Sequence, residues 1–221
     1  VRGPVVSQLQ AAFNDNWIKS TGEILHGEAY FPPQSEAGEM DAQMFISSPV
    51  GGGATMHLMY LMAIGAAEQS LDIQASYFVP DELALEAMLA AIERGVKVRI
   101  LVPGEHMDSE TVSIASKKLW GPLLKAGAEV YEFEPTMMHV KMMIVDNFMV
   151  SVGSTNFDER SFHLNDEASL NIYDRDFALA MTDVFERDMR DCEIYDHQKW
   201  SERPWTEKFM ETAIIPLRSQ L

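Results

Sequence analysis

Hydrophobic residues recur along the chain with two spacings, one typical of helices and the other of strands. Within 81–95 the apolar positions recur every three or four residues, Asp81 can cap the start, and Gly95 can end the helix. The next segment, 96–102, alternates apolar and other positions as a strand does. The same patterns predict helices at 5–19, 55–69, 109–125 and 177–190, and strands at 42–47, 71–77, 128–133, 140–145, 149–152 and 168–173.

The order of these elements predicts the fold class. Strands that alternate with helices favour a largely parallel sheet covered by helices on both faces. The last strands follow one another at short spacing, which favours antiparallel pairing in the same sheet. We therefore expect an α/β/α sandwich with a mixed, largely parallel central sheet at 41–195. An N-terminal helix and connection would occupy 1–40, and a partly helical tail 196–221.

Composition narrows the range of functions. The 221 residues include 17 Lys and Arg against 34 Asp and Glu, a formal net charge of −17. This charge argues against a general nucleic-acid binder and against electrostatic docking on an anionic membrane. The longest apolar stretch, 56–67, is too short to cross a bilayer. Cys192 has no second cysteine to pair with, and we interpret it as a small buried or half-buried residue near a helix end.

The stretch that carries chemistry begins at His139 and runs His-Val-Lys-Met-Met-Ile-Val-Asp. His139 and Lys141 stand two positions apart on a predicted strand, so their side chains point to one face. An imidazole beside an ammonium suits a phosphate, because one can attack or move protons while the other neutralises oxygens. The pattern H-x-K-x-x-x-x-D is expected roughly 0.014 times by chance in a chain of this composition.

The sequence after this strand resembles a known family. Gly153-Ser154-Thr155-Asn156 follows, and a carboxylate, Glu167, stands further on. With the His139 motif, these residues resemble the phospholipase D superfamily, most closely its bacterial cardiolipin synthase branch. Upstream stretches at 77–81, 94–99 and 124–128 also fit, so the resemblance covers about residues 42–190.

The resemblance implies a role for each matched residue. His139 would be the catalytic histidine, and Lys141, Ser154 and Asn156 would bind the substrate phosphate. Glu167 would accept a hydrogen bond from the second imidazole nitrogen of His139 and fix its tautomer. Asp146 stands too far along the strand to touch His139, so we expect it to brace a turn. The family chemistry requires no metal and no other cofactor.

Several residues near the motif allow two interpretations. Asp158 and Arg160 could contact substrate, although an ion pair that braces the loop is favoured. Tyr77 and Phe78 could line a lipid pocket or belong to the core. The triple glycine 51–53 lacks the spacing of a phosphate-binding loop and favours a flexible turn.

The remaining histidines lack such neighbours. A second H-x-K begins at His197, but Pro204 stands where Asp is required, which indicates solvated surface. His57, His106 and His163 are assigned no role from the sequence.

Members of the superfamily use two such motifs, and this chain has one. Its opening, Val1 to Trp17, resembles the end of a first repeat, so 1–40 would be the remnant of a missing N-terminal half and 41–195 the catalytic domain. The implied function is the second half of a phosphatidyltransferase that acts through a phosphohistidine on an alcohol such as phosphatidylglycerol. His139 would be the acid/base, with nucleophile as the alternative.

Three other functions remain as alternatives: a phospholipase D-type hydrolase, a single-motif homodimeric nuclease and an inactive half-site. The missing half or a second copy would be the protein partner. The charge weighs against the nuclease. The whole protein is expected at the bacterial inner membrane through segments outside this chain, which by itself would be soluble.

Overall fold

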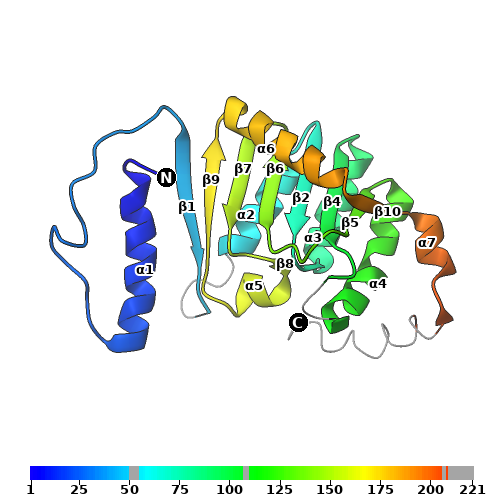
Figure 1. The fold of residues 1–221 in the computed structure, drawn as a ribbon, viewed down its shortest axis with the longest axis horizontal. Helices are drawn as coiled ribbons and strands as arrows, with labels where there is room; N and C mark the ends of the chain where they lie inside the picture. The colour runs from blue at the N-terminus through cyan, green and yellow to red at the C-terminus, as the bar shows by residue number, and fades with distance from the viewer. Residues whose placement is uncertain (50–54, 107–109, 206–207, 209–221) are drawn as a thin grey trace.

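The computed structural model describes residues 1–49, 55–106, 110–205 and 208 (Figure 1). The helices are α1 (Val5–Thr21), α2 (Thr55–Ala66), α3 (Glu82–Glu93), α4 (Glu110–Ala126), α5 (Glu159–His163), α6 (Arg175–Met189) and α7 (His197–Glu202). The strands are β1 (Asp41–Ser47), β2 (Ser70–Ala75), β3 (Phe78–Val79), β4 (Lys97–Pro103), β5 (Glu129–Phe133), β6 (Lys141–Val145), β7 (Met149–Gly153), β8 (Phe157–Asp158), β9 (Glu167–Tyr173) and β10 (Cys192–Tyr195).

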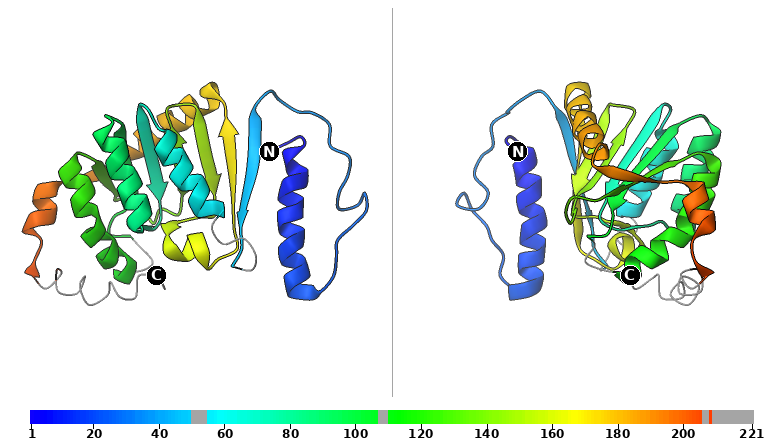
Figure 2. Two further views of the ribbon diagram at one scale, coloured as in Figure 1. Left: turned by 180° about the vertical axis from the view of Figure 1, so that it is seen from behind. Right: turned by 45° about the vertical axis from the view of Figure 1, so that its right-hand side comes forward.

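An eight-stranded sheet in the order β1-β9-β7-β6-β2-β4-β5-β10 forms the middle layer. Helices α2, α3 and α4 cover one face and α6 crosses the other, while α1 stands beyond the edge strand β1 (Figures 1 and 2). The three-layer α/β/α arrangement predicted from the sequence is thus confirmed. Strand β6 lies near the middle of the sheet, and all five of its residues are buried.

The sheet is mixed, but the expectation that it is largely parallel is wrong. In the described part of the sheet, two strand pairs are parallel, β2 with β4 and β4 with β5. The other five pairs are antiparallel. Helical crossovers α3 and α4 join the parallel strands, whereas short connections such as the β6–β7 turn produce antiparallel neighbours.

The spacing of hydrophobic residues did not predict several short elements. Cys192 lies three residues after the end of α6, near a helix end as predicted, and it begins the edge strand β10, which the patterns did not predict and which pairs with β5. Its thiol donates to the Asp188 carbonyl oxygen, and burial raises its pKa to about 12. The two-residue strands β3 and β8 pair only with each other, a length too short for periodicity to reveal. The triple glycine lies outside the described residues.

A buried ion pair fastens α6 to the sheet. The Arg99 guanidinium on β4 binds both oxygens of Asp72 on β2, with Nε–Oδ1 and Nη2–Oδ2 distances of 2.6 and 2.7 Å. The Asp72 side chain is 1% exposed, and the guanidinium lies 5.2 Å from the centre of the Phe185 ring on α6. A buried charge without its partner is costly, so this pair makes the docking of α6 depend on Asp72.

Replacing Asp72 with Asn should therefore lower the free energy of unfolding by about 3 kcal/mol, because the largely buried Arg99 would lose the carboxylate that binds it twice and keep the more distant, exposed Glu186 carboxylate at 3.5 Å. Urea denaturation of the 221-residue chain measures this loss. The matched control is Lys97→Gln, which breaks the exposed pair with Glu129 and should cost less than about 1 kcal/mol. Equal losses in the two variants would contradict the importance assigned to the buried pair.

Candidate active site

Lys141 is a charged side chain buried at the first position of β6. It is 8% exposed, and strand alternation places it on the α2–α4 face together with Met143 and Val145. Its ammonium lies 3.0 Å from Ser76 Oγ and 3.1 Å from each ring nitrogen of His139. A buried ammonium needs such polar partners, so the start of β6 is a polar site built into the edge of the core.

His139 lies just before β6 and is exposed, unlike Lys141. Its two ring nitrogens are equally far from the Lys141 ammonium, so whichever nitrogen lacks a proton can accept a hydrogen bond from Lys141. The structure thus brings together the two residues that the spacing placed on one face. The imidazole is therefore accessible to a ligand. The neighbouring Lys141 ammonium is buried and is held in place by the Ser76 hydroxyl.

Ser76 is a site residue that the sequence did not reveal. It follows β2 and is 2% exposed. Its backbone N–H and its hydroxyl both lie within hydrogen-bond distance of the Val140 carbonyl oxygen, at 3.1 and 3.2 Å. Ser76 therefore holds the segment that carries His139 and Lys141. Ser76 could have been identified only from the register of β2 with β6, in which Ala75 pairs with Lys141. No local sequence motif encodes that register.

Ser154 follows β7 at the same edge of the sheet. The register pairs Met142 of β6 with Val152 of β7 and Gly153 of β7 with Ser169 of β9, so Ser154 lies one strand away from Lys141. A Cβ atom on Gly153 would lie 2.6 Å from Ser169 Cα, which is closer than real side chains approach. Glycine at this position thus lets β7 approach β9 and sets Ser154 against β9.

Glu167 begins β9 and is 8% exposed. Its Oε2 accepts a short hydrogen bond from the Ser154 hydroxyl, and its Oε1 accepts one from Asn165 Nδ2 at 3.0 Å. The expected hydrogen bond to His139 is not among the contacts of the described residues, in which Ser154 and Asn165 are the side-chain donors to this carboxylate. The structure thus pairs Glu167 with Ser154, and a role toward His139 stays a prediction.

Asn156 is the fourth residue of the Gly153 motif. Its Oδ1 is buried, and no described residue supplies a hydrogen bond to it. The preceding residue, Thr155, is 2% exposed, and its hydroxyl lies 3.1 Å from the hydroxyl of Ser169. Nearby, burial raises the pKa of Tyr60 to about 12, so this phenol stays neutral in the core.

Asp146 lies at the far end of β6 from His139. Its carboxylate accepts three backbone N–H groups, from Glu68 at 2.9 Å, Gln69 at 2.7 Å and Ser70 at 2.8 Å. Its own φ of +52° places it in a tight turn. The contacts fit the bracing role expected from its distance along the strand, because they fix the turn after β6 to the start of β2.

Asp158 caps a helix, and the predicted ion pair with Arg160 is not found among the described residues. Asp158 Oδ1 accepts the Ser161 backbone N–H at 2.6 Å at the start of α5, while Arg160 is exposed. Asp158 is 2% exposed, and burial raises the pKa of its carboxyl to about 6 despite the hydrogen bonds from Ser161. Phe78 belongs to the core, where it contacts Phe157.

The second H-x-K segment lies on the surface, as predicted. Asp196 caps α7 through the Lys199 N–H, and the His197 ring stacks on Trp200 at the opposite edge of the sheet from β1. His57 and His163, which the sequence left without roles, come together with Asp81 elsewhere in the fold.

Residues 60–189 match the protein family described as cardiolipin synthase, PLD-like domain. The chain belongs to this family. It is 33% identical over 215 residues to a cardiolipin synthase of Geobacillus kaustophilus (strain HTA426), an alignment that covers 96% of this chain and 43% of that protein. The chain thus spans less than half the length of this curated relative.

Solved structures show the same fold. A phospholipase D family member, Nuc from Salmonella typhimurium, superposes with a TM-score of 0.61 at 24% identity, over 72% of this chain and 99% of that one. Phosphatidylserine synthase from Haemophilus influenzae Rd KW20 superposes with a TM-score of 0.67 at 14% identity, over 82% of this chain and 48% of that one. The PLD-like fold is therefore shared where sequence identity is low.

The buried Asp158 of this PLD-like domain should make stability depend on pH. Between about pH 4 and pH 6 the folded chain holds a proton on Asp158 that the unfolded chain releases, so stability falls as pH rises through this window and the loss is complete above it. Asp158→Asn keeps a capping oxygen and removes the charge. The variant should therefore gain about 2 kcal/mol relative to the parent between pH 4 and pH 7.

Urea denaturation at several pH values measures this difference. Asp196→Asn is the control, because Asp196 caps α7 in the same way but is exposed. The prediction is contradicted if the difference in free energy of unfolding between Asp158→Asn and its parent does not change with pH. That result would show that Asp158 is ionised at pH 4 in the folded chain.

Proposed function

We propose that this chain is the second catalytic half of a cardiolipin synthase-like phosphatidyltransferase, which moves a phosphatidyl group to an alcohol such as phosphatidylglycerol. The observation that carries the proposal is the buried Lys141 ammonium, held by Ser76 beside the exposed imidazole of His139. A fixed positive charge next to an accessible ring nitrogen suits a phosphodiester, whose oxygens need neutralising while a proton moves.

The phosphate pocket would be completed by Ser154 and Asn156. Both follow β7 at the edge of the sheet where β6 begins, one strand away from Lys141. The Ser154 hydroxyl can donate to a phosphate oxygen. The Asn156 amide has a buried oxygen to which no described residue donates, and its NH₂ group supplies further donors for a ligand.

The reaction would pass through a phosphohistidine. The nucleophilic histidine forms a P–N bond while the P–O bond to glycerol breaks, and the acid/base histidine gives its proton to the leaving glycerol oxygen. The same group then takes the proton of the acceptor hydroxyl, whose oxygen forms the new P–O bond as the P–N bond breaks. We assign the acid/base role to His139, with the nucleophile in a partner half.

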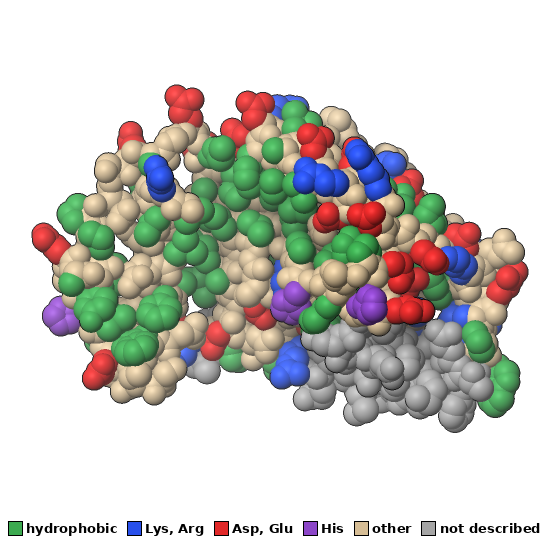
Figure 3. All heavy atoms as spheres, in the orientation of Figure 1, with side chains coloured by type: hydrophobic (Ala, Val, Ile, Leu, Met, Phe, Trp, Pro, Cys, Tyr) green, Lys and Arg blue, Asp and Glu red, His purple; other side chains and the backbone are tan. Residues whose placement is uncertain are grey.

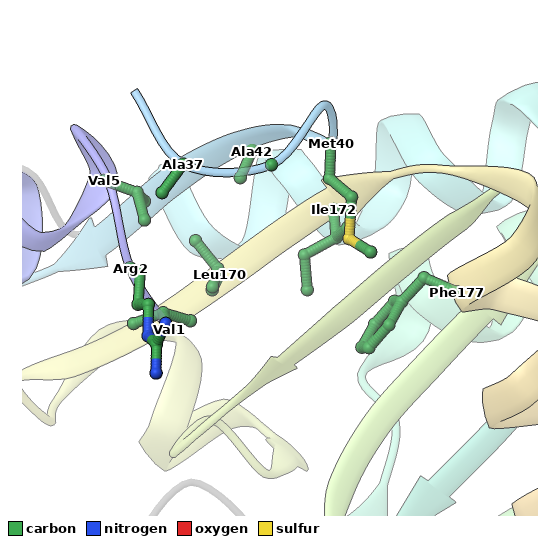
Figure 4. A pocket seen from close by; sticks show the side chains of 10 residues that line it. Val1, Arg2, Val5, Ala37, Met40, Ala42, Leu170, Ile172 and Phe177 are labelled. Atoms are coloured by element: carbon green, nitrogen blue, oxygen red, sulfur yellow. The ribbon is translucent and has the colours of Figure 1, made fainter. Parts of the chain in front are cut away.

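An uncovered apolar surface supports a partner half. On the α6 side of the sheet, hydrophobic side chains gather over β1, β9 and β7 between α1 and α6 (Figure 3). Ile46 and Val152 on this surface are 40% and 39% exposed. Beside them a cavity of about 390 Å³ opens between the N-terminal segment and Leu170, Ile172 and Phe177 (Figure 4).

Exposed apolar patches of this kind mark interfaces. Because the chain matches only 43% of its Geobacillus relative, the proposed occupant is the other half of such a longer protein, with a second copy of this chain as the alternative.

The whole protein is proposed to work at the bacterial inner membrane, where its phospholipid substrates reside. Among the described residues, no helix combines the length and apolar character needed to span a bilayer. We propose that segments outside this chain attach the protein to the membrane.

Replacing His139 with Ala should lower cardiolipin formation at least about 100-fold, because general acid–base catalysis contributes that much or more. The measurement is turnover of phosphatidylglycerol in detergent micelles by the longer protein that contains both motifs. His197→Ala is the matched control, since it removes the histidine of the other H-x-K segment and should leave turnover unchanged. Normal turnover by His139→Ala would refute the assignment.

The products separate the remaining possibilities. Cardiolipin and glycerol indicate transfer, whereas phosphatidic acid indicates that water is the acceptor. Turnover by the 221-residue chain alone, lost in His139→Ala, would show that two copies build a site. No turnover by the chain alone, with activity restored when the other half is added, would identify a half-site.

A further inference from the structure

Three potential metal ligands converge outside the phosphate site. His57 lies on α2, Asp81 immediately precedes α3, and His163 ends α5. One ligand atom from each residue lies within 4.8 Å of the other two. These residues come from three separate parts of the chain, so no local sequence spacing could indicate the cluster.

His57 is fixed and incompletely satisfied. The residue is 6% exposed, and its ring stacks on Phe162 with centroids 4.9 Å apart. Its Nε2 is buried and lies 3.0 Å from Asp81 Oδ2, but the geometry is not that of a hydrogen bond. A buried ring nitrogen without a hydrogen bond is costly, so this atom is open to another partner.

Asp81 is oriented by the helix that it caps. Its Oδ1 accepts the Ala84 backbone N–H at 2.8 Å, which leaves Oδ2 directed at His57. A carboxylate held in this way presents one oxygen to the cluster at little further cost in side-chain entropy.

His163 supplies the adjustable ligand. It is exposed at the end of a five-residue helix, and its ring meets the His57 ring edge-on with centroids 5.2 Å apart. Ligands around a tetrahedral Zn²⁺ ion lie about 3.4 Å apart, given metal–ligand distances near 2.1 Å. The 3.0 Å distance between His57 Nε2 and Asp81 Oδ2 is close to this spacing. Rotation of the exposed His163 side chain can bring its ring nitrogen to a similar distance from both atoms.

We propose that His57, Asp81 and His163 bind one Zn²⁺ ion, with water in the fourth position. Two imidazoles and one carboxylate form a ligand set that Zn²⁺ favours. The formal net charge of −17 also favours association with a cation. The bound ion would tie α2 and the start of α3 to α5, and it takes no part in the proposed phosphohistidine chemistry.

The experiment is calorimetric titration of ZnCl₂ into the 221-residue chain after treatment with a chelator and its removal. We expect one site with micromolar or tighter affinity and a rise in melting temperature with zinc. His163→Ala should weaken binding at least tenfold while the apo chain keeps its fold, because the residue is exposed. Asp81→Asn, which keeps a capping oxygen but loses the carboxylate charge, should also weaken it.

His197→Ala is the matched control, since it removes an exposed histidine from α7 and should leave zinc affinity unchanged. Replacing zinc with Co²⁺ gives a second readout, a visible absorption band in the parent chain that disappears in His163→Ala. Absence of binding below about 100 µM, or binding that His163→Ala and Asp81→Asn leave intact, would overturn the proposal.

Discussion

The candidate site depends on one constraint, the burial of the Lys141 ammonium at the head of a strand that is otherwise wholly apolar. Such a charge can stay in place only if the fold supplies polar partners, and Ser76 and His139 supply them. Ser76 also binds the Val140 carbonyl oxygen, so the same hydroxyl supports the ammonium and holds the strand that carries it. The antiparallel register of β2 with β6 is what makes this arrangement possible.

Local patterns were sufficient for the motif and for most of the long elements. His139 and Lys141 could be placed on one face because strand geometry fixes residues two apart, and the caps at Asp81 and Gly95 marked a helix that the structure contains at Glu82–Glu93. The three-layer class followed from the order of elements. These predictions succeed because each depends on interactions between near neighbours in the chain.

Pairings between distant segments could not be obtained in this way. Ser76 and the His57–Asp81–His163 cluster depend on which strands and helices become neighbours, and no periodicity encodes that choice. The balance of parallel and antiparallel strands was misjudged for the same reason. Short elements such as β10 and β8 also carry too few residues to show a pattern.

The buried carboxylates differ in how firmly they are held, and this difference bears on Glu167. Asp72 is bound by a guanidinium and Asp158 by a backbone N–H, donors that the fold fixes in place. Glu167 instead accepts from two neutral side chains, the hydroxyl of the exposed Ser154 and the amide of the half-buried Asn165. A carboxylate with such donors can change partners without a change in the backbone.

That freedom reconciles the observed contacts of Glu167 with the role that family membership suggests. A serine hydroxyl has one proton to donate, so Ser154 cannot bind Glu167 and a substrate phosphate oxygen at once. If phosphate accepts a hydrogen bond from Ser154 as proposed, Oε2 of Glu167 would lose this donor, and a buried carboxylate oxygen without a donor is costly. The N–H of His139 would then be a suitable replacement, which would orient the imidazole only when substrate is bound. The Ser154–Glu167 hydrogen bond is thus the contact expected of the site before phosphate binds.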